Sequence, residues 1–306
     1  MIGYFGKLPG NADFISYRAT NEDLQAFDEC LQVGMRRLME EDEWETHFDA
    51  IPRCSFLFRA SPQHWLVGEM ASSRDASGRR YPLMIFQRLP AQLQGARFSA
   101  PWTLCEVTAR GAGEVMQDAI YGHGQVARFA EAVLALRPLN DSDLNLHQRL
   151  HARLLQELRL CDISEAMSKG YPEFIANGVL QRMTGLRQLC KRMPMPPVVL
   201  PLPAEQALMR PMADIWTDWL TLIAPAPLNL FLLVHDFMRP RLLAFSSHDR
   251  ARIHRLLAGL ATRQERFDVL ESFERFDPSL VQTALPDPKQ SIGNCMARYA
   301  GYDDRT

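Results

Sequence analysis

Hydrophobic residues recur every three or four positions between residues 24 and 38. This period predicts an amphipathic helix that begins after Thr20 or Asn21 and ends near Glu41. Arginines at positions 36 and 37 fall toward the opposite side of the helix. We therefore expect the helix to lie on a sheet through an apolar stripe made of Leu24, Phe27, Leu31, Met35 and Leu38.

Short apolar runs predict the strands of that sheet. Residues 1–8 form the first run, which ends at Pro9-Gly10, and residues 11–18 are then expected to be a loop. Pro82 is expected at the start of its strand, because proline cannot donate a hydrogen bond within a ladder. Three runs with short connections predict antiparallel neighbours at residues 55–59, 65–70 and 81–89.

Helical patterns dominate the middle of the chain. Residues 104–120, 125–136 and 174–190 predict helices, and Asn140 can cap a further one that has leucines along one side. Residues 140–195 thus indicate a helical segment that is added to the α/β part.

The last third of the chain has a mixed pattern. Five prolines between residues 194 and 203 favour an extended segment, which is either a linker or an edge strand. Residues 205–212 predict a short helix, and a separate apolar piece begins at Ile215. Residues 228–234 predict a buried strand, and residues 248–260 predict a helix.

These elements together predict an α/β protein. We expect a three-layer α/β sandwich with a mixed or largely antiparallel sheet and an added helical segment. Residues 1–139 are assigned to an N-terminal α/β region and residues 140–195 to the helical insertion. Residues 196–306 are expected to complete the α/β domain and to end, past residue 277, in an irregular tail.

The composition is that of an ordinary globular protein, with 47% hydrophobic and 23% charged residues. The formal net charge of −2 gives no broad attraction to nucleic acid or to anionic membranes. No apolar run reaches the roughly 18 residues that span a bilayer, and no signal-peptide pattern begins the chain. We expect a cytoplasmic protein with no nucleic-acid partner and no membrane insertion. The six cysteines form no CxxC pair, which predicts reduced thiols.

A lysine follows a glycine directly after the first predicted strand, which invites comparison with phosphate-binding loops. The GxxxxGK[ST] pattern of those loops is absent, and Leu8-Pro9 stands where their helix would begin. We interpret Gly6-Lys7 as a tight turn in which Gly6 and Gly10 supply unusual backbone angles, and we expect no cofactor.

Candidate metal ligands lie on one face of the helix predicted after residue 140. Asp143, His147 and His151 are spaced by four residues. Two histidines at this spacing can bind zinc, but the glutamate of the HExxH pattern is absent. We interpret the three residues as a polar, solvated face and expect no metal ion.

Signals for other chemistry are weak. No GxSxG motif and no catalytic-cysteine signature is present, so no residue is assigned a catalytic role. Trp216 and Trp219 would share a helical face. We interpret them as core residues, with exposed interface residues as the alternative.

A turn rich in charged residues precedes the strand at 81–89. Asp75 can pair with Arg79 or Arg80 there. In one interpretation this is a solvated turn with an exposed ion pair, which contributes about 0–1 kcal/mol. In the other, Lys7, Asp13, Asp75 and Arg79 converge at one end of the sheet and form a charged patch suited to docking another protein.

An ordered set of motifs in the first 90 or so residues resembles the TagF (ImpM) family of type VI secretion accessory proteins. That family typically reads G-x-x-GKLP-x-x-GDFV near its start, and this chain has residues 3–9 followed by Asp13-Phe14-Ile15. A W-D-x-W-L-Q-like segment is similar to residues 27–32, although Phe27 and Cys30 replace two tryptophans. An S-x-D-x-x-GR-x-[FY]-PL segment matches residues 73–83.

The resemblance implies a three-layer α/β fold and a cytoplasmic protein that is not an enzyme. Such a protein represses type VI secretion after translation by binding the forkhead-associated scaffold component, in opposition to a threonine phosphorylation switch. The alternative is a small-molecule- or nucleotide-responsive enzyme that uses Lys7, Asp13, Asp75 and Arg79. The resemblance implies a partner-binding or motif role for Gly6, Lys7, Leu8, Pro9, Asp13, Phe14, Asp28, Ser73, Asp75, Gly78, Arg79, Tyr81 and Pro82. Both a contact surface and a purely structural turn are compatible with the first motif.

Overall fold

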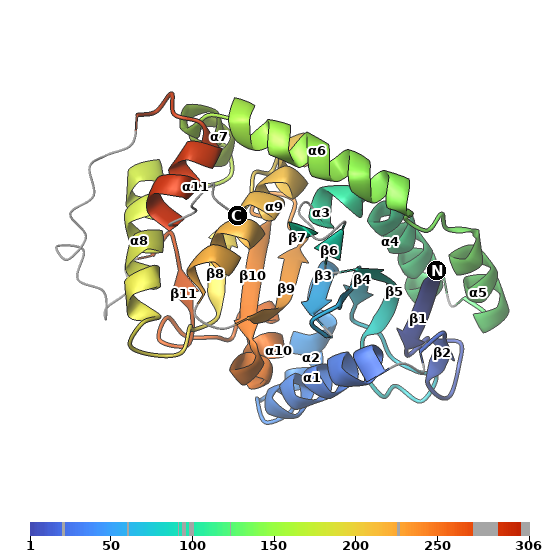
Figure 1. Cartoon of the computed structure of the whole chain (residues 1–306). Helices are drawn as coiled ribbons and strands as arrows, with labels where there is room; N and C mark the ends of the chain where they lie inside the picture. Colours follow the sequence, from blue (N-terminus) through green and yellow to red (C-terminus); the bar gives the residue numbers. More distant parts are fainter. Residues whose placement is uncertain are drawn as a thin grey trace.

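The computed structural model describes residues 1–19, 22–59, 61–90, 92–93, 96–97, 101–122, 124–224, 227–271 and 287–300. Within these ranges, nine strands form one sheet in the order β11-β8-β10-β9-β3-β4-β5-β1-β2 (Figure 1). Neighbouring strands are antiparallel except β11 and β8, which are parallel. The strands are β1 (Ile2–Gly6), β2 (Ile15–Tyr17), β3 (Cys54–Arg59), β4 (His64–Ala71), β5 (Leu83–Pro90), β8 (Val198–Pro201), β9 (Leu228–Val234), β10 (Arg241–Ser246) and β11 (Phe267–Asp268), with β6 (Gln92–Leu93) and β7 (Ala96–Arg97) as a separate pair.

Helices cover both faces of this sheet and make three layers (Figure 1). One face carries α1 (Glu22–Leu38), α2 (Trp44–Asp49), the 3₁₀ helix η1 (Ser247–Arg252) and α10 (Ile253–Leu257). The other face carries α3 (Pro101–Leu104), α4 (Glu106–Tyr121), α5 (Val126–Ala135), α6 (Asp141–Glu157), α7 (Leu160–Ser168), α8 (Ala176–Leu189), α9 (Gln206–Ile223) and α11 (Ile292–Ala300). The predicted three-layer α/β fold with a largely antiparallel sheet and an added helical segment is confirmed.

Strands β3 and β9 lie in the middle of the sheet, and both of their faces are buried. Along β3, Phe56 and Phe58 pack into the core under α1, whereas Leu57 packs into the core under α9. Along β9, Leu232 packs into the core under α1, and Phe231 packs into the core under α9. Their nearly continuous apolar sequences follow from this, because neither face of either strand meets water.

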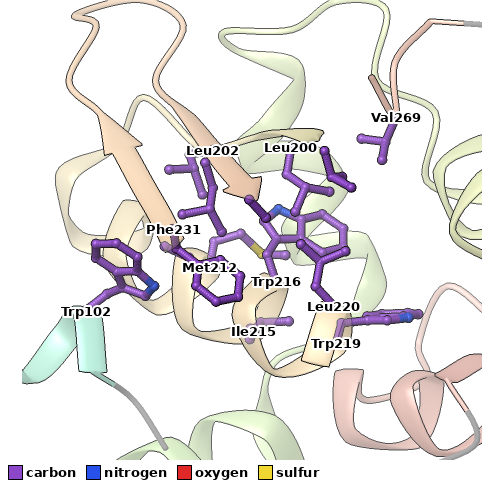
Figure 2. Close-up of a cluster of buried hydrophobic side chains, with 14 of the residues drawn as sticks. Trp102, Leu200, Leu202, Met212, Ile215, Trp216, Trp219, Leu220, Phe231 and Val269 are labelled. Carbon is purple, nitrogen blue, oxygen red and sulfur yellow. The ribbon is translucent and has the colours of Figure 1, made fainter. Parts of the chain in front are cut away.

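Helix α9 is the centre of the larger core (Figure 2). Trp216 and Trp219 are 3% and 2% exposed, so the interpretation of both as core residues is confirmed. The indole Nε1 of Trp216 donates a hydrogen bond to the carbonyl oxygen of Pro201, 2.9 Å away. In this core, Met212, Ile215 and Leu220 of α9 lie among Trp102, Leu200, Leu202, Phe231 and Val269.

Three expectations about individual segments are wrong. Residues 11–18 are not all loop, because residues 15–17 form β2 and pair with β1. The break expected between residues 212 and 215 is absent, and α9 continues through Pro211. Its residues are buried on several sides, which offsets the roughly 3 kcal/mol that an internal proline costs a helix. Residues 292–300 form α11 rather than an irregular tail, because Ile292, Cys295 and Met296 pack into the core.

No helix of the described residues is both long and apolar enough to cross a membrane.

Candidate partner-binding site

The residues of the two N-terminal motifs meet at one end of the sheet. Strand β1 pairs with β5 in antiparallel register, with Phe5 opposite Met84. The loop that follows β1 therefore lies beside the turn that precedes β5. The pair of loops consists of residues 7–14 and 72–82, and hydrogen bonds join one loop to the other.

Two glycines have positive φ angles in this region, and the first permits the close approach of the loops. Gly6 has a φ of 136°, and a Cβ atom at this position would lie 2.1 Å from the carbonyl oxygen of Pro82. Gly78 has a φ of 82° in the second loop, and its N–H donates to the carbonyl oxygen of Asp75. Both positions need the conformational freedom of glycine. Gly10 does not have a positive φ, so the prediction of unusual backbone angles there is wrong.

The carboxylate of Asp75 is the centre of the site. Its Oδ2 accepts hydrogen bonds from Lys7 Nζ at 2.8 Å and from Arg79 Nε at 2.7 Å. Its Oδ1 accepts from the backbone N–H groups of Ser77 and Arg79, each at 2.9 Å. The side chain of Asp75 is fully buried and that of Lys7 is 7% exposed. Four donors thus surround one buried carboxylate.

These contacts keep Asp75 charged. Burial by itself raises the pKa of the carboxyl group, but the hydrogen bonds from Lys7 and Arg79 and the charge of Lys7 outweigh it. The pKa of Asp75 therefore lies well below its usual range. Asp75 therefore stays ionised at neutral pH, and Lys7 forms an ion pair with it inside the protein.

Backbone groups also join the two loops. The hydroxyl of Ser73 donates to the carbonyl oxygen of Lys7 at 2.7 Å, and the N–H of Ala76 donates to the carbonyl oxygen of Asn11 at 2.8 Å. The Nη2 atom of Arg79 donates to the carbonyl oxygen of Ala12 at 2.6 Å. The loops therefore behave as one rigid unit whose position is fixed by β1 and β5.

Aromatic residues cover one side of the site. Phe14 is 44% exposed, stacks on Phe5 with a centroid distance of 5.3 Å and meets Tyr81 edge-on at 5.1 Å. The Nζ atom of Lys7 lies 5.1 Å from the centroid of the Phe14 ring. The hydroxyl of Tyr81 donates to the carboxylate of Asp28 in α1. Burial and the hydrogen bond with Asp28 both raise the pKa of Tyr81.

The structure brings all thirteen predicted residues into this one region. Leu8, Pro82 and Lys7 are buried, as is Asp75, so these members hold the loops together. The outward-facing members are Pro9, Asp13, Phe14, Gly78 and Arg79.

The predicted convergence of four charged residues is present in the structure, with one member at its margin. Lys7 and Arg79 both contact Asp75, whereas Asp13 reaches Arg79 only at 4.0 Å and has a side chain that is 84% exposed. A hollow of about 470 Å³ opens beside the second loop, and Asp75 is the one member of the four among its lining residues. Both oxygens of Asp75 are already occupied by donors, so it offers little acid–base chemistry to a molecule bound there.

Two of the three residues proposed as a polar helix face, Asp143 and His151, have side-chain partners. The Nε2 atom of His151 is 2.8 Å from Oδ2 of Asp218, and His151 itself is buried. Asp143 accepts hydrogen bonds from Arg137 and from the N–H of Asn140, which caps α6. The interpretation as a fully solvated face is therefore wrong for His151. No group of three or more potential metal ligands occurs within the described ranges.

The structure contains a second buried cluster of charged residues that the sequence did not predict. Glu69 of β4 is fully buried, and its Oε1 accepts a hydrogen bond from Ser55 of β3. Arg53 Nε lies 3.5 Å from Oε2, and Arg210 Nη2 of α9 lies 3.7 Å from Oε1. His235, which follows β9, has its Nε2 3.6 Å from Oε2 of Glu69. The signal for this cluster in the sequence is Glu69, an acidic residue within the apolar run 65–70.

The grouping of Ser55, His235 and Glu69 does not have the geometry of a catalytic triad. In a triad the serine and the acid contact different nitrogens of the histidine ring. Ser55 Oγ and Glu69 Oε2 both approach Nε2 of His235, at 3.0 and 3.6 Å, and Ser55 is 2% exposed. Burial raises the pKa of Glu69, but His235 and the two arginines outweigh it and lower the value. The cluster joins β3 and β4 to α9 and to the end of β9.

Residues 3–136 match the family model described as TagF N-terminal domain, Type VI secretion system-associated. The N-terminal region of this chain belongs to the TagF family. This TagF region (residues 3–136) contains all thirteen residues of the candidate site and ends just after α5. The resemblance seen in the motifs is thereby confirmed.

The similarity to a solved structure is weaker than the match to the family model. The crystal structure of PA0076 from Pseudomonas aeruginosa PAO1 is similar with 20% sequence identity and a TM-score of 0.41. The alignment covers 49% of this chain and 78% of that chain. Similarity at this level supports no conclusion about the present chain. No curated protein matches the chain.

Proposed function

We propose that this protein represses type VI secretion after translation by binding the forkhead-associated scaffold component of the machinery. The observation that carries the proposal is the match of residues 3–136 to a domain associated with the type VI secretion system. An accessory role in that system follows from membership of the family. The partner, the negative direction of the effect and a cytoplasmic location are our proposals.

The candidate site supports a binding role rather than a catalytic one. Lys7 and Asp75 are buried and pair with each other, so neither charge is free for substrate chemistry. Phe14 and Arg79 are exposed on the rigid base that this pair creates. A surface that is ordered before binding loses little conformational entropy when a partner docks. Aromatic and arginine side chains are also the types that contribute most to protein interfaces.

The direct test measures binding between the purified full-length chain and the forkhead-associated component of the same gene cluster. We expect a stoichiometric complex, and we expect secretion to rise when the gene for this protein is deleted. Absence of binding together with unchanged secretion would reject the proposal. Secretion that falls on deletion would instead show that the protein is a positive factor.

A matched pair of variants tests whether the candidate site carries this binding. Arg79 pairs with an acidic residue four positions earlier, and so does Arg110, which pairs with Glu106 on α4. Both guanidinium groups are exposed, at 59% and 68%. We expect Arg79→Ala to weaken the complex and Arg110→Ala to leave it unchanged.

A further inference from the structure

Two hollows lie next to each other on the TagF region. The first, of about 470 Å³, lies between the loop at residues 72–78 and the end of α4. The second, of about 660 Å³, lies between α4 and α5. Tyr121, at the end of α4, lines both hollows and is 79% exposed. The two hollows therefore adjoin at the side chain of Tyr121.

An exposed arginine lines each hollow. Arg74 lines the first and Arg128 the second, and both residues are exposed. Neither guanidinium group makes an ion pair or hydrogen bond with any residue of the described ranges, unlike the guanidinium groups of Arg79 and Arg80. We call Arg74, Tyr121 and Arg128 together the Tyr121 surface.

The carboxylates of this surface are mostly neutralised. In the first hollow, Asp49 pairs with Arg80, and Asp75 pairs with Lys7 and Arg79. In the second hollow, Asp118 lines the wall and makes no side-chain ion pair within the described part of the chain. Among the described lining residues, two arginines and one carboxylate thus have no ion pair, so the Tyr121 surface carries an excess of positive charge although the whole chain has a net charge of −2.

We propose that the Tyr121 surface binds an extended acidic segment of the protein partner, an inference that rests on the proposed function. Carboxylates of the segment would pair with Arg74 and Arg128, and its backbone or an apolar side chain would cover the ring of Tyr121. Arginine and tyrosine are enriched among the residues that dominate interface energies. Two hollows that adjoin at Tyr121 suit an extended segment that contacts both.

Charge reversal tests the proposal. The full-length chain is titrated with the forkhead-associated component of its own cluster in a calorimeter. We expect the double variant Arg74→Glu/Arg128→Glu to lower affinity by about tenfold or more, because like charges then face the acidic segment. Tyr121→Ala should also weaken binding, whereas Tyr121→Phe should retain it because the ring remains. Higher salt should weaken the unaltered chain more than the double variant.

The matched control carries the same change of charge elsewhere. Arg149 on α6 and Arg192 after α8 are exposed and line neither hollow. Arg149→Glu/Arg192→Glu should bind as tightly as the unaltered chain. Every residue changed in this experiment is exposed, so unchanged melting temperatures are expected throughout and exclude misfolding as the cause.

The outcomes separate the two proposals. If the unaltered chain does not bind, the proposed function fails, and the inferred occupant of the Tyr121 surface fails with it. If the unaltered chain binds and both double variants bind equally well, the Tyr121 surface is wrong and the proposed function stands. Asp118→Asn removes a carboxylate that lines the second hollow without an ion pair to any described residue, and it should raise affinity. A loss of affinity in that variant would overturn an acidic occupant.

Discussion

Two buried carboxylates organise different parts of this molecule. Asp75 joins two loops that are both inside the TagF region, and each of its oxygens accepts two hydrogen bonds. Glu69 joins the TagF region to α9 and to the end of β9, and its Oε2 makes no hydrogen bond within the described residues. Its partners Arg53, Arg210 and His235 lie 3.5 to 3.7 Å away.

Asp75 therefore determines the shape of one surface region, whereas Glu69 connects distant parts of the fold. The hydrogen bonds of Asp75 join two surface loops, which expose Phe14 and Arg79. The longer ion pairs of Glu69 hold together elements that are about 140 to 165 residues apart in the chain. Since a buried charge that loses its partner is strongly destabilising, Glu69 should matter most for stability. Asp75 should matter most for the shape of the candidate site.

The largest effect is expected from breaking the Glu69 cluster. Arg210→Met leaves the buried carboxylate without one of its two arginines, and we expect a loss of about 3–5 kcal/mol in the free energy of unfolding. Denaturation in urea measures it. Arg239→Met is the control, because its partner Glu173 is exposed and such pairs contribute about 0–1 kcal/mol. Equal effects from the two variants would show that the Glu69 cluster does not hold the sheet to α9.

The next effect concerns the close approach of the loops around Asp75. Gly6→Ala places a methyl group against Pro82, whereas Gly78→Ala places one in open space. Both residues have positive φ, so each variant loses about 1–2 kcal/mol from backbone strain alone. We expect the Gly6 variant to lose more than the Gly78 variant in thermal unfolding. A larger loss for Gly78 would contradict the importance of this contact.

A buried histidine that has no hydrogen-bond partner among the described residues sharpens the comparison with the two paired carboxylates. His254 is 1% exposed, neither ring nitrogen has a hydrogen-bond partner within the described part of the chain, and burial lowers its pKa to about 4. The unfolded chain takes up the proton near pH 6.5, and the folded chain does so only near pH 4. His254 therefore stabilises the fold above pH 6.5, and this stability is lost as pH falls toward 4.

The pH dependence of unfolding checks this expectation. Between pH 7 and pH 5 the unaltered chain should lose about 2 kcal/mol because of His254. His254→Leu should lose correspondingly less over the same interval. Asp75 does not interfere, because its pKa is lowered and its contribution is lost only at more acid pH. Identical pH profiles would show that His254 is not the sensitive group.

The smallest effect on stability is expected from Arg79. Its side chain is 59% exposed, so Arg79→Ala should cost less than about 1 kcal/mol while it weakens partner binding. Asp75→Ala is a different experiment, because it removes the acceptor of Lys7 and of two backbone N–H groups. The burial of Asp75 makes Arg79 the better probe of binding alone. A large fall in the melting temperature of Arg79→Ala would assign that residue a structural role.

Much of the candidate site could be predicted from sequence, because its members belong to two short motifs. One interpretation of the motifs predicted that Lys7, Asp13, Asp75 and Arg79 converge at one end of the sheet, and the antiparallel pairing of β1 with β5 places their two loops together. Burial could not be predicted. Lys7 and Asp75 are polar residues in turns, which are usually solvated, and only the packing of the two loops encloses them.

Longer-range relationships were decided by the tertiary structure alone. The Glu69 cluster draws on four separate segments, and no spacing in the sequence connects Ser55 with Arg210 or His235. The same holds for Tyr121, whose two hollows exist because α4, α5 and the loop at 72–78 meet. The alternating and helical periods of the chain determined the three-layer α/β fold, because they specify which residues avoid water. The pairing and burial of the charged residues depend on contacts between segments that are distant in the sequence, and only the folded structure defines those contacts.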